Sequence, residues 1–157
     1  GWPFLHEGLS DESTTAKPLV WKLYTKASLG LKKYAEALRG AKTILELEEN
    51  PYRKAEALYF KSQAHNGLKQ FDEARLAASD ALNLRPAGAL DIQLRMFAGD
   101  IDITAKKPEA AIRHYIIVES TFAKSTDDKR EALAKVISTL KMIGTPKALE
   151  LLKDYQQ

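Results

Sequence analysis

The sequence contains no cysteine, which excludes disulfide bonds, thiolate metal ligands and a cysteine nucleophile. It has no apolar run near the roughly 18–20 residues needed to cross a bilayer, and no secretion signal is visible in it. The alternation of β-branched residues that is typical of strands is almost absent. We therefore expect a helical chain without a membrane span. The sequence does not decide between a cytoplasmic and an extracytoplasmic location.

Residues that could carry catalysis are also scarce, and the histidines are only His6, His65 and His114. Neither of the last two has a second metal-ligating type three or four residues later, the spacing that would share one helical face. Asp100 and Asp102 resemble a carboxylate pair, but residues two apart on a helix point to different faces. Nucleophile elbows, phosphate loops and dinucleotide turns are missing. We predict no enzyme, no catalytic residue, no metal and no cofactor.

The charge is small and evenly distributed along the chain. The 157 residues include 24 basic and 21 acidic side chains, for a formal net charge of +3. The basic pairs Lys32-Lys33 and Lys106-Lys107 fall at predicted turns and do not form one patch, so we expect no nucleic-acid partner. With 45% hydrophobic residues the chain can form a folded core.

From residue 17 onward the composition predicts helices throughout, and capping and proline residues mark the boundaries between them. Asn50-Pro51 and Thr145-Pro146 each combine an N-cap residue with proline at the first helical position. Residues 1–16 form a separate arm, in which Trp2 and Phe4 either pack on the first helix pair or a neighbour, or belong to a disordered terminus. The predicted helices cover residues 17–31, 34–49, 51–67, 71–85, 88–104, 108–124, 127–142 and 146–156. We expect His65 to be half-buried on its helix and His114 to lie on an outer face.

Alanines recur at a fixed interval of 37 residues, at Ala37, Ala74, Ala111 and Ala148. A period of this length predicts a stack of helix pairs in which small residues allow close approach of the backbones. Large neighbours such as Tyr34 and Phe71 would fill the space beside them. The predicted repeat domain, 17–157, therefore comprises units at about 17–50, 51–86, 87–124 and 125–157.

These columns resemble the tetratricopeptide repeat. The closest unit carries the residue types of that family at its usual spacing, namely Leu58, Ser62, Phe71, Ala74, Ala78, Ala81 and Pro86. The later units, with Ala111-Ile112 before Tyr115 and the segment 131–134, are similar to those of bacterial multi-repeat interaction proteins. The resemblance implies an all-α, right-handed αα-superhelix of about four helix pairs.

The resemblance also implies a concave groove, lined by the first helix of each pair, that binds a peptide or a partner helix. The residues in the corresponding columns are Lys22, Lys26, Leu29, Tyr59, Gln63, Asn66, Gln93, Met96 and Asp100. The lysines favour an acidic protein or peptide partner. We accordingly expect a non-enzymatic protein-interaction module.

Two alternatives remain open at this point. The chain could be a structural spacer or self-assembly element, forming a homo-oligomer through the repeat ends or the N-terminal arm. The last predicted helix favours this, because it carries Leu151, Leu152 and Tyr155 with no obvious capping helix after it. The chain could instead be an accessory repeat segment of a larger enzyme.

Overall fold

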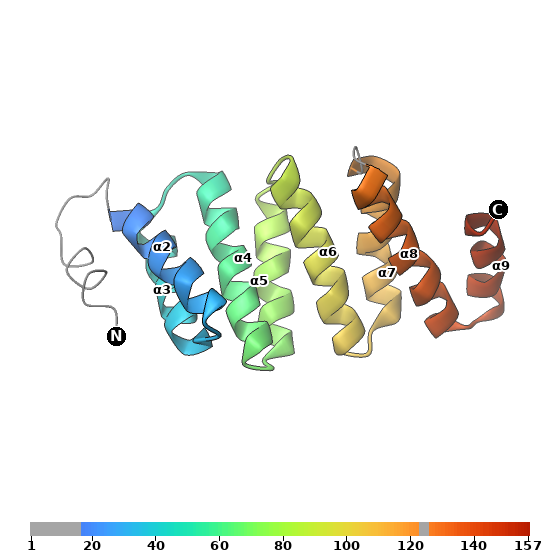
Figure 1. Ribbon diagram of the computed structural model, residues 1–157, viewed down its shortest axis with the longest axis horizontal. Coiled ribbons are helices and arrows are strands. Elements are labelled where there is room, and N and C mark those ends of the chain that lie inside the picture. Colours follow the sequence, from blue (N-terminus) through green and yellow to red (C-terminus); the bar gives the residue numbers. More distant parts are fainter. Residues whose placement is uncertain (1–16, 123–125) are drawn as a thin grey trace. The chain divides into compact units, whose positions relative to one another are not determined.

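The computed structural model describes residues 17–122 and 126–157, and within them the chain forms eight α-helices, one π-helical turn and no strand (Figure 1). The helices are α2 (Lys17–Gly30), α3 (Tyr34–Leu47), α4 (Pro51–Gly67), α5 (Phe71–Asn83), α6 (Ala89–Thr104), α7 (Pro108–Ile117), η1 (Val118–Phe122), α8 (Thr126–Ile143) and α9 (Pro146–Tyr155). The predicted all-α fold is confirmed. The arm, 1–16, with Trp2 and Phe4, lies outside the described residues.

The helices pack in the order of the sequence, as a helical repeat. The pairs are α2 with α3, α4 with α5, α6 with α7 and α8 with α9. The chain divides into two compact units, unit 1 through Pro86 and unit 2 from Ala87. In unit 1, α3 and α2 also contact α4, and in unit 2, α7 contacts α8. We call α2, α4, α6 and α8 the first helices, and α3, α5, α7 and α9 the second helices.

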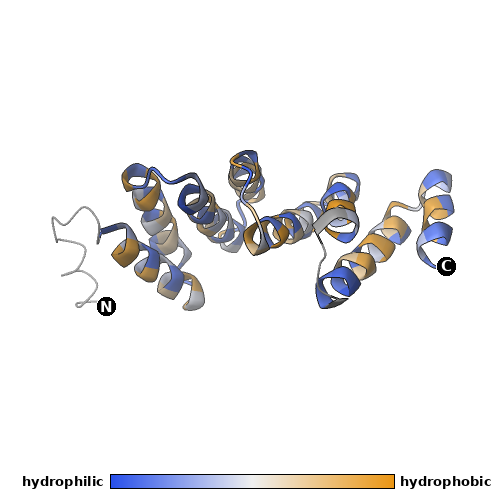
Figure 2. Cartoon of the chain, turned by 90° about the horizontal axis from the view of Figure 1, so that it is seen from above, coloured by the Kyte–Doolittle hydropathy of each residue, from blue (hydrophilic) through white to orange (hydrophobic). Residues whose placement is uncertain are grey.

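The alanines that recur every 37 residues are buried among the packed helices. Ala37, Ala74 and Ala111 are fully buried, and Ala148 is 7% exposed. Individual helices carry polar and apolar residues on different sides, as the colouring in Figure 2 shows. Buried small residues and amphipathic helices are what the packing of helix pairs requires.

The turn inside each of the first three pairs repeats the 37-residue period. In each turn an N–H group donates to a carbonyl five residues earlier, for example from Gln70 to His65 at 2.9 Å. The residue just before that donor has a left-handed backbone, with φ of 58°, 61° and 61° at Lys32, Lys69 and Lys106. In the fourth pair the left-handed residue is Gly144, one position later than the period predicts.

A column of buried polar residues follows the same period at the C-terminal end of the first helices. Its members are Ser28, His65, Asp102 and Thr139, all less than 9% exposed. The backbone carbonyls of the first three accept the turn bonds from Lys33, Gln70 and Lys107. The column therefore lies where each chain reversal begins.

One predicted helix differs from the structure. We expected a continuous α-helix over 108–124, but α7 ends at Ile117 and continues as the π-helical turn η1. The run Ile116-Ile117-Val118 is β-branched and restricts its side chains in an α-helix. The hydroxyl of Ser120 also donates to the carbonyl of Ile116 at 2.7 Å, a local bond that bends helices. These features account for the change at this point.

Candidate functional site

Six of the predicted groove residues lie on the first helices of unit 1. Lys22, Lys26 and Leu29 are on α2, and the others, on α4, are Tyr59, Gln63 and Asn66. Lys26 is exposed and the other five are partly exposed. Leu29 packs against the core cluster that includes Trp21 and Ile44, so part of its surface stabilises the unit.

Lys22 is held by an ion pair rather than left open for a ligand. Its Nζ atom lies 2.9 Å from Oε1 of Glu56, and this contact joins α2 to α4. The lysine side chain is 37% exposed and the glutamate side chain 22% exposed. The pair neutralises Lys22 and stabilises the contact between neighbouring first helices.

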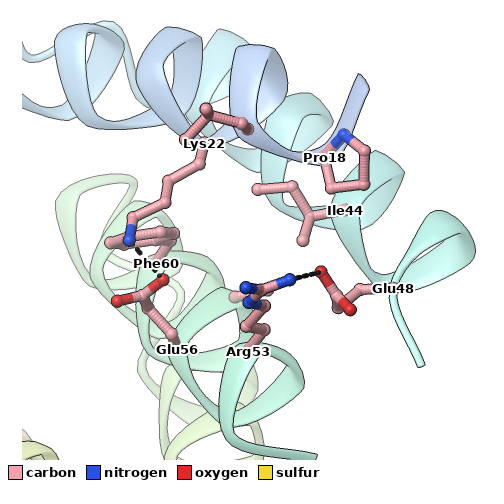
Figure 3. A pocket seen from close by; sticks show the side chains of 9 residues that line it. Pro18, Lys22, Ile44, Glu48, Arg53, Glu56 and Phe60 are labelled. Atoms are coloured by element: carbon pink, nitrogen blue, oxygen red, sulfur yellow. Dashed lines mark ion pairs between the residues drawn. The ribbon is translucent and has the colours of Figure 1, made fainter. Parts of the chain in front are cut away.

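Beside this ion pair, unit 1 contains a pocket of about 240 Å³, which we call the unit-1 pocket (Figure 3). Its lining comes from α2, α3 and α4 and from Glu48, the residue after α3. The residues are Pro18, Leu19, Lys22, Ile44, Glu48, Arg53, Glu56, Ala57 and Phe60. Ile44, Ala57 and Phe60 are buried and form an apolar floor. Small-molecule and peptide pockets have this character, apolar with a few polar groups.

The charges around the unit-1 pocket cancel in pairs. Lys22 pairs with Glu56, and Nη1 of Arg53 lies 3.8 Å from Oε2 of Glu48, as the dashed lines in Figure 3 mark. Two cations and two anions therefore surround an apolar floor. This arrangement disfavours an occupant with a single unpaired charge, because that charge would have to disrupt an existing pair.

In unit 2, the predicted residues Gln93, Met96 and Asp100 all lie on α6. Gln93 is exposed, whereas Met96 is partly buried and packs against the core cluster built around Tyr115 and Leu140. Much of the Met96 side chain therefore stabilises the unit. Asp100 is the member of this set with the most structural partners.

Asp100 connects three helices of unit 2. Its Oδ1 atom accepts a hydrogen bond from the Tyr115 hydroxyl on α7 at 2.6 Å and another from Lys135 Nζ on α8 at 2.5 Å. Lys135 Nζ also lies 5.5 Å from the centroid of the Tyr115 ring, within cation–π range. Burial raises the pKa of Tyr115, and its bond to Asp100 raises that pKa further, so the phenol stays protonated.

This network borders a second pocket of about 310 Å³, which we call the unit-2 pocket. It lies between the first helices α6 and α8, and Tyr115 on α7 is part of its wall. The full lining is Asp100, Ile103, Thr104, Tyr115, Lys135, Ser138, Thr139 and Met142. Hydroxyl groups and one paired carboxylate contribute its polar atoms.

The two histidines in the described residues, His65 and His114, each lie close to a polar side chain of the protein. His65 is 8% exposed, more buried than expected, and its Nδ1 lies 2.7 Å from Oε1 of Gln70. The expectation that His114 lies on an outer face is wrong, because its side chain is only 26% exposed and its Nε2 is 3.8 Å from Oδ2 of Asp102. In residues 17–122 and 126–157, no three His, Asp or Glu side chains are grouped to hold a metal ion. In the same residues no helix has the length and apolarity needed to cross a membrane.

Sequence reasoning did not identify Lys135 or the rim residues Glu48, Arg53 and Glu56. Moving forward one period from Asp100 leads to Ile137, so the repeat does not point to Lys135 as its partner. The rim pairs join α2 to α4 and the residue after α3 to α4, and no spacing in the chain encodes such contacts. A signal was available for the buried polar column, since Ser28, His65, Asp102 and Thr139 share the alanine period.

No known protein family, curated protein or solved structure matches this chain.

Proposed function

We propose that this protein is a non-enzymatic interaction module whose first helices bind a peptide or a helix of a protein partner. One observation supports the proposal above the others. Each unit has an open pocket between two consecutive first helices, α2 and α4 in unit 1 and α6 and α8 in unit 2. Hollows between neighbouring helices are common binding sites in helical proteins. The resemblance to tetratricopeptide repeats favours the same surface.

Four of the nine predicted groove residues take part in ion pairs or core packing. Lys22 and Asp100 are engaged in ion pairs, while Leu29 and Met96 contribute to packing. In unit 1 we assign partner contact to Lys26, Tyr59 and Gln63, which combine a cation, an aromatic face and an amide. The exposed Lys26 favours an acidic segment, and this attraction weakens with salt.

The test is a selection of peptides from a random display library on the intact protein, followed by affinity measurement on the enriched peptides. Lys26→Ala with Tyr59→Ala is the test variant. Lys42→Ala with Tyr52→Ala is the matched control, because it removes the same residue types from the exposed positions 42 and 52. We expect at least about tenfold weaker binding for the test variant, a loss of about 1.4 kcal/mol, and less than about twofold change for the control. Equal affinities of both variants, or no enriched peptide, would overturn the proposal.

A structural or self-assembly role is the second candidate, and α9 supplies the observation that favours it. Leu149 and Leu151 are 44% and 38% exposed on this helix. Exposed apolar side chains promote association. Light scattering over a range of concentrations discriminates the candidates: a mass that rises with concentration, and stays low in a Leu149→Lys, Leu151→Lys variant, supports self-assembly.

A further inference from the structure

One face of α2 carries exposed apolar side chains. Leu23 is 53% exposed, and Leu19, one helical turn earlier, is 59% exposed. Val20 and Ala27 lie beside Leu23 at helical spacing and are partly exposed. We call Leu19, Val20, Leu23 and Ala27 the α2 end face. None of the four residues is charged, and an exposed apolar surface of this kind is typical of an interaction site.

The 37-residue period relates the α2 end face to a contact inside the chain. The residues one period after Val20, Leu23 and Ala27 lie on α4 and are buried, namely Ala57, Phe60 and Ala64. Phe60 packs in one core cluster with Ile44 of α3, the second helix that precedes α4. Among the described residues no second helix precedes α2. The α2 end face is therefore equivalent to a surface that packs on a second helix.

The second helix α9 exposes the matching position. Leu149 is 44% exposed, whereas Ile112, one period earlier on α7, is 9% exposed. Ile112 belongs to the core cluster that includes Val136 and Leu140 of α8, the first helix that follows α7. No helix follows α9 within residues 17–122 and 126–157. Leu149 thus occupies a position that, in the preceding pair, is buried with the help of the next first helix.

Charge favours α9 over a second α2 helix as the occupant of the α2 end face. The helix α2 has three lysines and no acidic residue. Lys22 is paired with Glu56, but Lys17 and Lys26 leave α2 positive, so two α2 helices packed together would repel each other. On α9, Glu150 and Asp154 are exposed and balance its two lysines. A basic helix can therefore pack on α9 without accumulating charge of one sign.

We infer that the α2 end face is the docking site for α9 of a second copy of this chain. Leu149 and the exposed leucines of α2 are buried together in this contact, which repeats between copies the packing of α3 on α4 and of α7 on α8. An unrelated partner on α2 would leave the matching face of α9 exposed, whereas a second copy buries both. The inference rests on self-assembly, the second candidate function above, and identifies the surface that receives α9.

Two different surfaces meet in this contact, so it is heterologous. Every dimer keeps one free α2 end face and one free α9. Association therefore continues beyond the dimer unless a ring closes.

The absence of cysteine allows the contact to be tested with single-cysteine copies of the full chain. Leu23→Cys and an isotope-labelled Leu149→Cys are mixed in equal amounts and treated with a short bismaleimide. Mass spectrometry then distinguishes the mixed cross-linked dimer from the two like dimers. Leu76→Cys in place of Leu23→Cys is the matched control, because Leu76 is 63% exposed on α5, outside the α2 end face.

We expect the mixed dimer of Leu23→Cys and Leu149→Cys to form at least about tenfold faster than the mixed dimer of the control. Adding Leu19→Ser to the Leu23→Cys copy should slow this product by about fivefold or more, because it removes apolar area from the α2 end face. Circular dichroism verifies that every variant remains helical.

Two outcomes of the cross-linking overturn the inference. Preferred formation of the Leu23→Cys like dimer would make a second α2 the occupant, and a mixed dimer that forms no faster than the control would leave α9 without a role. Light scattering on the unmodified chain separates this failure from that of the candidate function. A mass that rises with concentration without the preferred cross-link overturns the inference alone, whereas a constant monomer mass overturns self-assembly as well.

Discussion

The hydroxyl of Tyr115 and the carboxylate of Asp100 share a hydrogen bond of 2.6 Å that joins α7 to α6. Lys135 on α8 donates to the same carboxylate oxygen, so one atom contacts three helices of unit 2. Tyr115 is 2% exposed, whereas the Asp100 side chain is 48% exposed. The carboxylate thus fixes a buried phenol while remaining accessible at the wall of the unit-2 pocket.

Removal of this hydroxyl should destabilise the protein moderately. We expect Tyr115→Phe to lower the free energy of unfolding by about 1–2 kcal/mol, since a hydrogen bond to a charged acceptor is lost. Urea denaturation provides the measurement. Tyr52→Phe is the matched control, because Tyr52 is 48% exposed, and it should change stability by less than about 0.5 kcal/mol. A similar loss in both variants would contradict the assignment.

The raised pKa of Tyr115 should make the free energy of unfolding depend on pH in the alkaline range. Burial raises the pKa of Tyr115 from its ordinary value of 10.0, so the folded state retains the proton longer than the unfolded state. Its contribution is present in full below pH 10.0 and is lost as the pH rises beyond that value. Unfolding midpoints in urea, measured from about pH 8 to about pH 11, should fall less steeply for Tyr115→Phe. Burial also raises the pKa values of Tyr24 and Tyr155, so some slope remains. Identical slopes in the two proteins would refute this prediction.

Gly99 provides a test of close packing between α6 and α7. A Cβ atom at this position would clash with the ring of Tyr115. We expect Gly99→Ala to cost about 1–3 kcal/mol, because overpacking outweighs the higher helix propensity of alanine. Gly30→Ala is the control, since a Cβ there meets nothing within 4 Å and should be neutral or stabilising. Thermal unfolding of both variants would decide, and equal melting temperatures would argue against the predicted clash.

The left-handed lysines predict a stabilising substitution. Lys69 has a φ of 61°, a conformation that glycine adopts without the Cβ strain of other residues. Lys69→Gly should raise stability by about 0.5–1 kcal/mol, while Lys69→Ala should not. Differential scanning calorimetry measures the effect. The equivalent change at Lys106, whose φ is also 61°, should add to it because the two turns are 37 residues apart in sequence and belong to different compact units. A loss of stability in Lys69→Gly would contradict the assigned turn geometry.

The ion pair between Lys22 and Glu56 can be measured by a double-mutant cycle with alanine at both positions. We expect a coupling free energy of about 0.3–1 kcal/mol, because both side chains are partly exposed. The coupling should decrease at about 1 M salt, where the Debye length is short. A coupling near zero at low salt would mean that Lys22 is available to a ligand after all.

The predicted helices agree with the structure where the sequence signals are local. The caps at Asn50 and Thr145 form as expected, with side-chain oxygens accepting from Arg53 and Ala148 backbone N–H groups at 3.1 and 3.2 Å. The buried alanine at position 111 follows from the period alone. The prediction of a continuous α-helix over 108–124 was wrong beyond Ile117, because it did not allow for the β-branched run at 116–118 and the bond from Ser120 to the Ile116 carbonyl.

The sequence predicted the fold better than it predicted the candidate site. The groove residues were predicted on the assumption that equivalent positions of the repeat have the same role in every unit. Lys22 and Met96 occupy the same column, yet one forms an ion pair with α4 and the other packs into a core. Roles of this kind depend on which side chain lies opposite, and that residue belongs to another helix.

By itself, the sequence determined the all-α class, the four helix pairs and the small residues at their contacts. These follow from helix propensity, capping residues and the 37-residue alanine period, which act over short stretches of chain. Only the tertiary structure decided that Asp100 contacts Tyr115 and Lys135, and that paired charges surround the apolar floor of the unit-1 pocket. Those relationships join residues up to 35 positions apart, at distances set by helix packing rather than by spacing in the chain.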